Sequence, residues 1–358
     1  MTKPRSRPFD DVVVDHIQYT VGDLPAATGW LVDGYGFSVF AAPVAPTTTR
    51  PVRSAGLRQG RIELVLTEPA VDDHPATAYL ERHGDGVSDI ALGVPDAAAA
   101  FTEAVRRGAR PSSSPVRRGN AVTAAVMAFG DVTHTFVQRD PATDRLPWLG
   151  RTPGVTGAGT GLHGIDHFAV CLEPGQLDPT VDFYTDVLDF DMIFTERIVV
   201  GTQAMNSKVV QSRSAAVTLT LIEPDTSREP GQIDSFLKNH GGAGVQHVAF
   251  VTDDIVSSVG TISGRGIEFL RTPATYYQLL AERVELARHT GAELRALNLL
   301  VDEDPGGQLF QIFARSTHPR DTFFVEVIER FGARTFGSSN IKSLYEAVEL
   351  QRAQGHDA

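Results

Sequence analysis

The stretch "GIDHFAV", residues 164–170, is repeated with changes near the N-terminus as "VVDHIQY", residues 13–19. Each copy places a histidine, His167 or His16, inside a short apolar run. Short runs rich in β-branched and aromatic residues are typical of strands. A phrase that occurs twice in one chain therefore predicts that a folded unit is repeated.

The repeat extends outward from both copies. The segment "GDGVSDIALGV" (84–94) matches "GGAGVQHVAFVT" (241–252), and a helical pattern follows each. A Pro-, Gly- and Thr-rich stretch without periodicity separates the two halves. We therefore expect an α+β fold in which four β-α-β-β-β units pair into two half-open barrel domains. The expected bounds are 1–140 for the N-terminal domain, 141–163 for the linker and 164–358 for the C-terminal domain.

Composition excludes several classes of partner. The 358 residues carry a formal net charge of −12, and phosphate binding needs a net basic face, so we expect no nucleic-acid partner. No apolar run approaches the ~18 residues of a membrane span, and no apolar segment follows the basic N-terminus as a secretory signal requires. Cys171 is the only cysteine, which favours a reducing compartment. We therefore expect a cytoplasmic protein without a membrane partner.

The two halves differ at three polar positions. The second half carries His167, His247 and Glu326. The matched positions of the first half carry His16, Asp89 and, in a less secure alignment, Gln138. Two imidazoles and one carboxylate form the set that holds non-haem Fe(II) on one face and leaves positions open for substrate and O₂. Zn²⁺ is the competing metal, and His16 is expected to be structural.

Each member of this set has a plainer interpretation. Glu326 lies in "FFVEVI" (323–328), where an ionised carboxylate is costly to bury unless it is paired or bound to a metal. The alternative is that the strand lies at a sheet edge and Glu326 faces water. A single histidine in an apolar strand is more often a core residue with satisfied hydrogen bonds. The repeat, however, should bring His167 and His247 together, which favours the metal site.

The sequence resembles the 4-hydroxyphenylpyruvate dioxygenase family of the vicinal-oxygen-chelate superfamily over nearly its whole length. The specific matches are "GIDHFAV", "GGAGVQHVAF", "GGQLFQIFA" and "FFVEVIERFGARTFGSSNIKSLYEAVE". The resemblance implies Fe(II) bound by His167, His247 and Glu326. It also implies that 4-hydroxyphenylpyruvate binds the iron through its own α-keto acid and reacts with both atoms of O₂, releasing CO₂.

Within the family, "VVGTQAMNSKVVQS" and "VTLTLIEPD" are most similar to the branch that hydroxylates the benzylic carbon. That branch forms 4-hydroxymandelate, which feeds 4-hydroxyphenylglycine into glycopeptide antibiotics. The alternative is the ring-hydroxylating branch, which forms homogentisate in tyrosine catabolism. Relatives of the second branch usually read "PINEP" and "GNF" where this chain has Thr220, Ile222 and Ile341. We expect these residues to present the benzylic carbon rather than the ring, although neutral drift would give the same pattern.

The resemblance implies further substrate-binding residues. They are Ser207, Gln246, Gln311, Phe313 and Phe336, with a core role equally compatible for Phe313. The final amphipathic segment, about 338–353, resembles a family helix that covers the iron; a plain packing helix is the alternative. We expect a homodimer.

Two other function classes remain open. A glyoxalase-like isomerase or an extradiol dioxygenase would use similar units and a similar triad, but would not need the "TFGSSNIKSLYEA" segment. A metal-free binding module of this fold would lose the triad, whose three residues are all present here.

Overall fold

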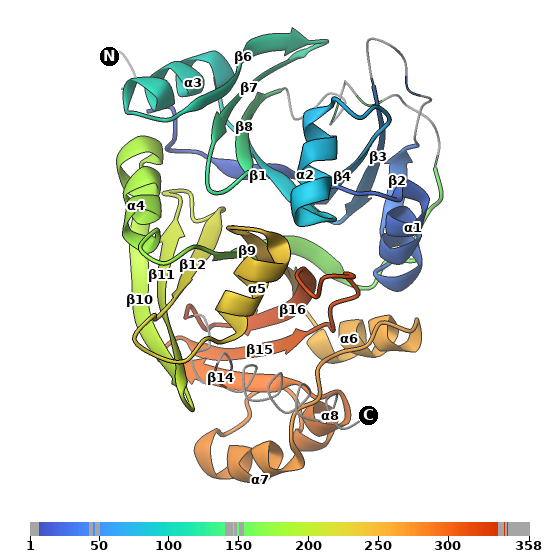
Figure 1. Ribbon diagram of the computed structural model, residues 1–358. Coiled ribbons are helices and arrows are strands. Elements are labelled where there is room, and N and C mark those ends of the chain that lie inside the picture. The colour runs from blue at the N-terminus through green and yellow to red at the C-terminus, as the bar shows by residue number, and fades with distance from the viewer. Residues whose placement is uncertain are drawn as a thin grey trace, which may run out of the picture.

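Two eight-stranded sheets, one from each half of the chain, form the body of the protein (Figure 1). This computed structural model describes residues 7–42, 46, 51–139, 146, 149, 154–335, 340 and 342. The first sheet contains β1 (Val13–Thr20), β2 (Ser38–Ala41), β3 (Val52–Gln59), β4 (Ile62–Pro69), β5 (Gly86–Gly93), β6 (Pro111–Arg118), β7 (Ala121–Met127) and β8 (Thr133–Gln138). The second contains β9 (Leu162–Cys171), β10 (Asp191–Val200), β11 (Gln203–Gln211), β12 (Thr218–Pro224), β13 (Gly244–Thr252), β14 (Leu300–Asp304), β15 (Gly307–Phe313) and β16 (Phe324–Phe331).

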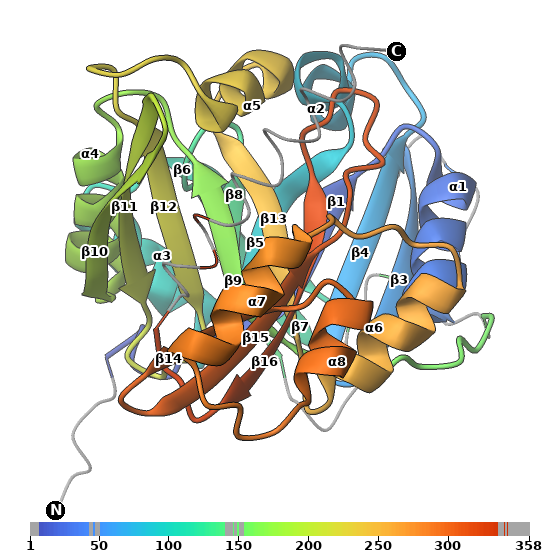
Figure 2. The ribbon, with the colours of Figure 1, turned by 90° about the horizontal axis from the view of Figure 1, so that it is seen from below.

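The helices connect these strands and lie outside the sheets. They are α1 (Leu24–Gly29), α2 (Pro75–His83), α3 (Ala97–Arg106), α4 (Leu177–Asp182), α5 (Gln232–His240), α6 (Ile255–Gly264), α7 (Ala274–Arg283) and α8 (Gly291–Ala296). Two π-helical turns, η1 (Trp30–Gly34) and η2 (Phe183–Val187), extend α1 and α4. The second half differs from the first by α7 and α8, which lie with α6 beside its sheet (Figure 2).

The strand order confirms the repeated unit. The sheets run β2-β3-β4-β1-β5-β8-β7-β6 and β10-β11-β12-β9-β13-β16-β15-β14, so each sheet joins two four-stranded units at an antiparallel pair. The predicted fold class of paired β-α-β-β-β units is confirmed. Apart from Asn340 and Lys342, the proposed lid helix lies outside the described residues, as does much of the proposed linker. The domain bounds stay a prediction.

The register corrects one alignment made from the sequence. Asp89 pairs with Thr133 on β8 as His247 pairs with Phe324 on β16. The counterpart of Glu326 is therefore Thr135, and the match to Gln138 was wrong. Two short apolar runs align equally well in several registers, and only the strand pairing selects one. The backbone N–H of Thr135 donates to the Asp89 carboxylate at 2.9 Å, so the first half satisfies this carboxylate internally.

One apolar core joins the two halves. It includes Ile17 and Phe37 from the first half and Phe168 and Phe250 from the second, and Phe37 contacts Phe250. The fully buried His134 also bridges the halves, because its Nδ1 donates to the carbonyl of Ile90 and its Nε2 accepts from the Tyr184 hydroxyl, both at 2.9 Å. Burial lowers the pKa of His134 to about 4.

The lowered pKa of His134 predicts that the unfolding free energy decreases in acid. The folded pKa of about 4 lies below the unfolded value of 6.5, so the unfolded chain takes up the proton first as the pH falls. The stabilising contribution is complete above about pH 6.5 and is lost toward pH 4. Between pH 7 and pH 5 we expect His134 to account for roughly 2 kcal/mol of lost unfolding free energy. Denaturant unfolding at both pH values measures this loss. In His134→Gln the loss should be smaller by that amount, and an equal loss in both proteins would contradict the assignment.

Candidate metal centre

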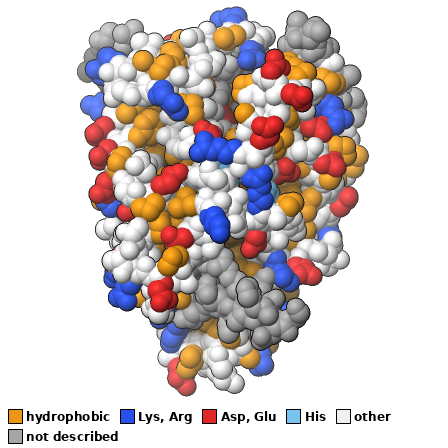
Figure 3. Space-filling view, viewed as in Figure 1, with side chains coloured by type: hydrophobic (Ala, Val, Ile, Leu, Met, Phe, Trp, Pro, Cys, Tyr) orange, Lys and Arg blue, Asp and Glu red, His pale blue; other side chains and the backbone are white. Residues whose placement is uncertain are grey.

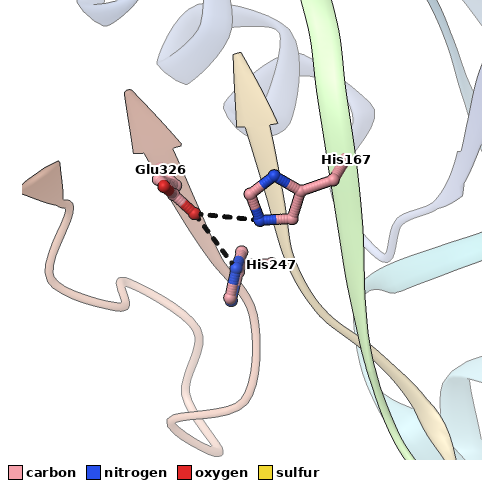
Figure 4. A group of neighbouring side chains, drawn as sticks. All are labelled: His167, His247 and Glu326. Carbon is pink, nitrogen blue, oxygen red and sulfur yellow. Dashed lines mark ion pairs between the residues drawn. The ribbon is translucent and has the colours of Figure 1, made fainter. Parts of the chain in front are cut away.

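Three neighbouring strands bring His167, His247 and Glu326 to one point (Figure 4). The carboxylate Oε2 of Glu326 lies 3.3 Å from His167 Nε2 and 3.2 Å from His247 Nε2. One ligand atom from each side chain lies within 4.8 Å of the others, and all three residues are buried. The predicted triad is therefore assembled. The edge-strand alternative for Glu326 is wrong, because β16 lies between β13 and β15 and Glu326 is 0% exposed.

The donor atoms of this triad fit a bound cation. The 3.2 and 3.3 Å separations exceed the roughly 2.7–2.9 Å of charge-assisted hydrogen bonds. Glu326 Oε2 is buried and makes no hydrogen bond within the described part of the chain. A buried acceptor without a partner costs free energy, and a metal ion between the two nitrogens and this oxygen would remove that cost. The residues present therefore fit a divalent metal.

The charges around the triad favour the same interpretation. Burial raises the pKa of Glu326, but the charge of His167 and the closeness of both imidazoles outweigh it and lower that pKa to about 2. Burial lowers the pKa of His167, but Glu326 and Asp166 outweigh it and raise that pKa to about 9. Burial, as the largest cause, lowers the pKa of His247. At neutral pH the Glu326 carboxylate is therefore ionised and His167 holds an extra proton. A metal ion could take the place of that positive charge.

A carboxylate behind His167 fixes the ring. Asp166 Oδ1 lies 2.8 Å from His167 Nδ1, and Arg330 donates to both oxygens of Asp166 at 2.6 and 2.8 Å. This contact selects the tautomer with hydrogen on Nδ1, so that the Nε2 lone pair faces Glu326. The sequence analysis did not include Asp166 or Arg330. The signal was present in the opening phrases, because aspartate precedes histidine in both copies.

The first half provides a matched control for this contact. There His16 Nδ1 lies 2.7 Å from Asp15, which accepts from Arg139 at 2.6 Å, but no metal triad adjoins it in the described structure. We expect Asp166→Asn to lower metal affinity about 10–100-fold, because the supporting carboxylate is lost. Titration of the metal-free protein with Co²⁺ measures this. Asp15→Asn should leave the affinity unchanged, and an equal effect of both variants would refute the role of Asp166.

A chain of amides holds the other oxygen of Glu326. Gln311 Nε2 donates to Glu326 Oε1 at 2.6 Å, and Asn340 Nδ2 donates to Gln311 Oε1 at 2.8 Å. All three side chains are buried. Gln311, predicted from the sequence as a substrate-binding residue, contacts the triad carboxylate, and its role toward the substrate stays a prediction.

The register places most predicted pocket residues on the same sheet face as the triad. Phe313, Glu326, Ala249 and His167 form one cross-strand row, because each pairs with the next. His247, Ala169 and Thr220 form the adjacent row. Cys171, Ile222 and Ser207 form a third. Side chains opposite each other in a sheet point to the same face, so these rows line one concave surface.

Individual environments within these rows differ. Thr220 is buried, and its hydroxyl makes no hydrogen bond to the described residues. Ile222 packs in an apolar cluster with Cys171 and Met205. The Phe313 ring lies 5.8 Å from the His247 ring, edge to face. These environments are compatible with the predicted pocket, and the roles stay predictions.

The remaining predicted residues are less defined. Gln246 is buried at a β-bulge next to His247, a kind of irregularity that can re-aim a side chain. Phe336 and Ile341 lie outside the described residues.

A second group of potential ligands has no similar need for a metal. Asp254, His289 and Glu329 also lie close together. Glu329, however, already pairs with Arg288 at 2.8 Å and His289 at 2.9 Å, and it accepts from the Ile255 N–H at 2.7 Å. Its charge is compensated by the protein, in contrast to that of Glu326.

The face of the molecule in Figure 3 carries charged side chains of both signs. Acidic and basic side chains are interspersed over the face in Figure 3, and the described residues of that face form no continuous basic area. In the described part of the chain, no helix combines the length and apolar character needed to span a bilayer.

Comparisons with known proteins identify the family. Residues 164–312 and 15–126 each match models of the glyoxalase/bleomycin resistance protein/dioxygenase superfamily. The chain is 32% identical to a 4-hydroxyphenylpyruvate dioxygenase of Aspergillus fumigatus, over 95% of this chain and 92% of that protein. It is also 32% identical to the 4-hydroxyphenylpyruvate dioxygenase of Dictyostelium discoideum, over 94% of this chain and 97% of that protein. It is 42% identical to the solved structure of a mutant 4-hydroxymandelate synthase from Streptomyces coelicolor, with TM-score 0.84, over 96% and 99%. The chain thus belongs to the 4-hydroxyphenylpyruvate dioxygenase family, and it is an oxidoreductase of the dioxygenase type.

Proposed function

We propose that this dioxygenase uses Fe(II), held by His167, His247 and Glu326, to convert 4-hydroxyphenylpyruvate and O₂ into 4-hydroxymandelate and CO₂. The assembled triad, in which Glu326 Oε2 makes no hydrogen bond within the described residues, is the observation that carries the metal assignment. The product assignment is supported by the 42% identity to a 4-hydroxymandelate synthase, compared with 32% to two curated 4-hydroxyphenylpyruvate dioxygenases. When bound, Fe(II) supplies open coordination positions for the keto acid and O₂. We place the product in the supply of 4-hydroxyphenylglycine for antibiotic biosynthesis.

The side chains around the triad have separate tasks in this proposal. Asp166 holds the Nδ1 proton of His167, which leaves Nε2 free to bind the metal. Gln311 holds one oxygen of Glu326, which leaves the other toward the imidazoles. The triad is buried, and exclusion of water strengthens the electrostatic interactions there.

The concave sheet surface would select the reacting carbon. Thr220 lies two strands across the sheet from His247, through Ala169. Its hydroxyl makes no hydrogen bond to the described residues and would be offered to a polar group of the substrate. Ile222 offers an apolar wall where homogentisate-forming relatives usually carry an asparagine. We propose that this wall, with Ile341, holds the aromatic ring so that the benzylic carbon is attacked.

A product assay tests this function. Purified protein with Fe(II), ascorbate, O₂ and 4-hydroxyphenylpyruvate should yield a chromatographic peak that co-elutes with 4-hydroxymandelate. Because homogentisate has the same mass, retention against both standards decides. A homogentisate peak would refute the product assignment and leave the metal assignment standing. Failure of Fe(II) to support turnover where Zn²⁺ does would refute the metal assignment.

A further inference from the structure

A second cavity lies away from the metal centre, where the two halves of the chain meet. It has a volume of about 250 Å³ and is bounded by β1 and α1 of the first half and by the loop between β15 and β16 of the second. That loop is fixed to the first half, since Arg320 donates to the carbonyl oxygens of Arg82 at 2.6 Å and Glu81 at 3.1 Å. Both ribbon views place the loop beside α2 (Figures 1 and 2). The two surfaces that bound the cavity are therefore held together by hydrogen bonds.

The walls of this cavity are mainly apolar and aromatic. Tyr19 and Phe323 meet edge to face with ring centroids 5.4 Å apart, and Trp30 forms a further part of the wall. Drug-sized ligands occupy pockets of roughly 300–1,000 Å³, so this smaller cavity suits a molecule with a single ring. Aromatic walls favour a flat apolar group and also attract a cation placed over a ring face.

Two carboxylates add negative charge to the same cavity. Asp23 and Asp85 both belong to its lining. Each accepts one backbone hydrogen bond, from Ala26 and Gly22 respectively, at 2.9 Å. Within the described residues, neither forms an ion pair. The described lining of the cavity therefore holds two carboxylates and no Lys or Arg side chain.

The histidine in the lining does not alter this balance at neutral pH. His318 Nδ1 accepts from the Arg320 N–H at 3.0 Å. Burial lowers the pKa of His318 in spite of the opposing charge of Asp85, so the imidazole is neutral at pH 7. Arg320, on the same loop, keeps its positive charge while it donates to main-chain carbonyls, but it does not belong to the cavity lining.

The cavity is separate from the metal centre. Phe323 lines the cavity, whereas the next residue, Phe324, stacks on the His247 ring at 4.9 Å. Consecutive residues of an extended chain point in opposite directions, so the cavity and the triad lie on opposite sides of this segment. None of the triad residues belongs to the cavity lining.

We propose that this interdomain cavity is a binding site for a small organic cation, a primary amine that carries one aromatic ring. The ring occupies the apolar part between Tyr19, Trp30 and Phe323, and the ammonium group pairs with Asp85 at the mouth. Asp85 is the better partner of the two carboxylates because it is half-buried, while Asp23 is exposed. The proposal goes beyond the dioxygenase activity and does not depend on it.

Tryptophan fluorescence tests this site. The chain has two tryptophans, so the background variant Trp148→Phe leaves Trp30 as the sole indole. The probe is 2-phenylethylamine, with 2-phenylethanol as its uncharged match and 3-phenylpropanoate as an anion. We expect a saturable change in Trp30 emission with the amine, and at least about tenfold weaker binding of the alcohol, equivalent to roughly 1.4 kcal/mol. The anion should not bind.

Variants locate the bound amine. Asp85→Asn keeps the shape of the side chain and its acceptance from Gly22, and should weaken amine binding about tenfold or more. Asp73→Asn, an exposed carboxylate outside the cavity lining, should have no effect. His167→Ala should leave amine binding unchanged, since the metal centre is separate. Equal affinity for amine and alcohol, no effect of Asp85→Asn, or loss of binding in His167→Ala would each overturn the proposal.

Discussion

Glu326→Gln is expected to abolish measurable O₂ uptake with 4-hydroxyphenylpyruvate and to lower iron affinity more than about 100-fold. Loss of a side chain that only supports a metal ligand typically costs about 10–100-fold, and loss of a ligand should cost more. The amide keeps the size of Glu326 and can still accept from Gln311, but it removes the negative charge opposite the two imidazoles. Equilibrium dialysis against Fe(II) without oxygen and an oxygen electrode measure the two effects.

Glu63→Gln is the matched control for this change. Glu63 is also a buried strand carboxylate, 2% exposed, and it lies 3.3 Å from Arg139 in the first half. Its replacement should affect stability but not iron affinity. If Glu326→Gln bound iron as tightly as the unchanged protein, Glu326 could not be a ligand.

The double variant Ile222→Asn, Ile341→Phe is expected to shift the product from 4-hydroxymandelate toward homogentisate. Both changes restore the residues usual in homogentisate-forming relatives. A misplacement of about 1 Å at the reacting atoms can change a rate about 100-fold, so a shift of the product ratio by tens of fold is expected. Chromatography of the products from one substrate preparation measures the ratio. The variant should also unfold at a lower temperature, because Ile222 packs against Cys171 and Met205 and an amide there loses apolar burial.

The variant Ile198→Asn is the control that separates the effect on stability from the effect on the product ratio. Ile198 belongs to the same apolar cluster as Ile222, so an amide there should lower stability in a similar way. It should not change the product ratio, because Ile198 lies in a cross-strand row with Met205 and Pro224, one row farther from the triad than the row of Ile222. An unchanged ratio in the double variant would indicate that Ile222 and Ile341 reflect drift and do not select the product.

The repeated phrase predicted the fold because alternation and chain symmetry are local properties of the sequence. The same symmetry predicted that His167 and His247 would meet, and strand pairing confirms it. The sequence could not select the register of the last strand of each half, and the match of Gln138 to Glu326 failed for that reason. Contacts between distant segments, such as Arg330 with Asp166, depend on how the sheet curves and were not visible in the sequence.

The two halves share one framework but differ at the triad positions. The first half keeps the aspartate–histidine–arginine contact of Asp15, His16 and Arg139. It replaces the second imidazole with Asp89, whose carboxylate accepts from the N–H of Thr135, and it has no carboxylate at the Glu326 position. Burial raises the pKa of Asp89 to about 6. A single aspartate–histidine phrase is therefore insufficient to predict a ligand, and the complete set decides.

The most direct test of the account measures gas exchange. Anaerobic protein loaded with one equivalent of Fe(II) is mixed with 4-hydroxyphenylpyruvate and O₂, without 2-oxoglutarate, and O₂ consumed and CO₂ released are counted together. The account predicts one CO₂ for each O₂, strict dependence on Fe(II), and no uptake in Glu326→Gln. Iron-loaded protein that consumed no O₂ with this substrate, or that consumed it equally well without Glu326, would contradict the account.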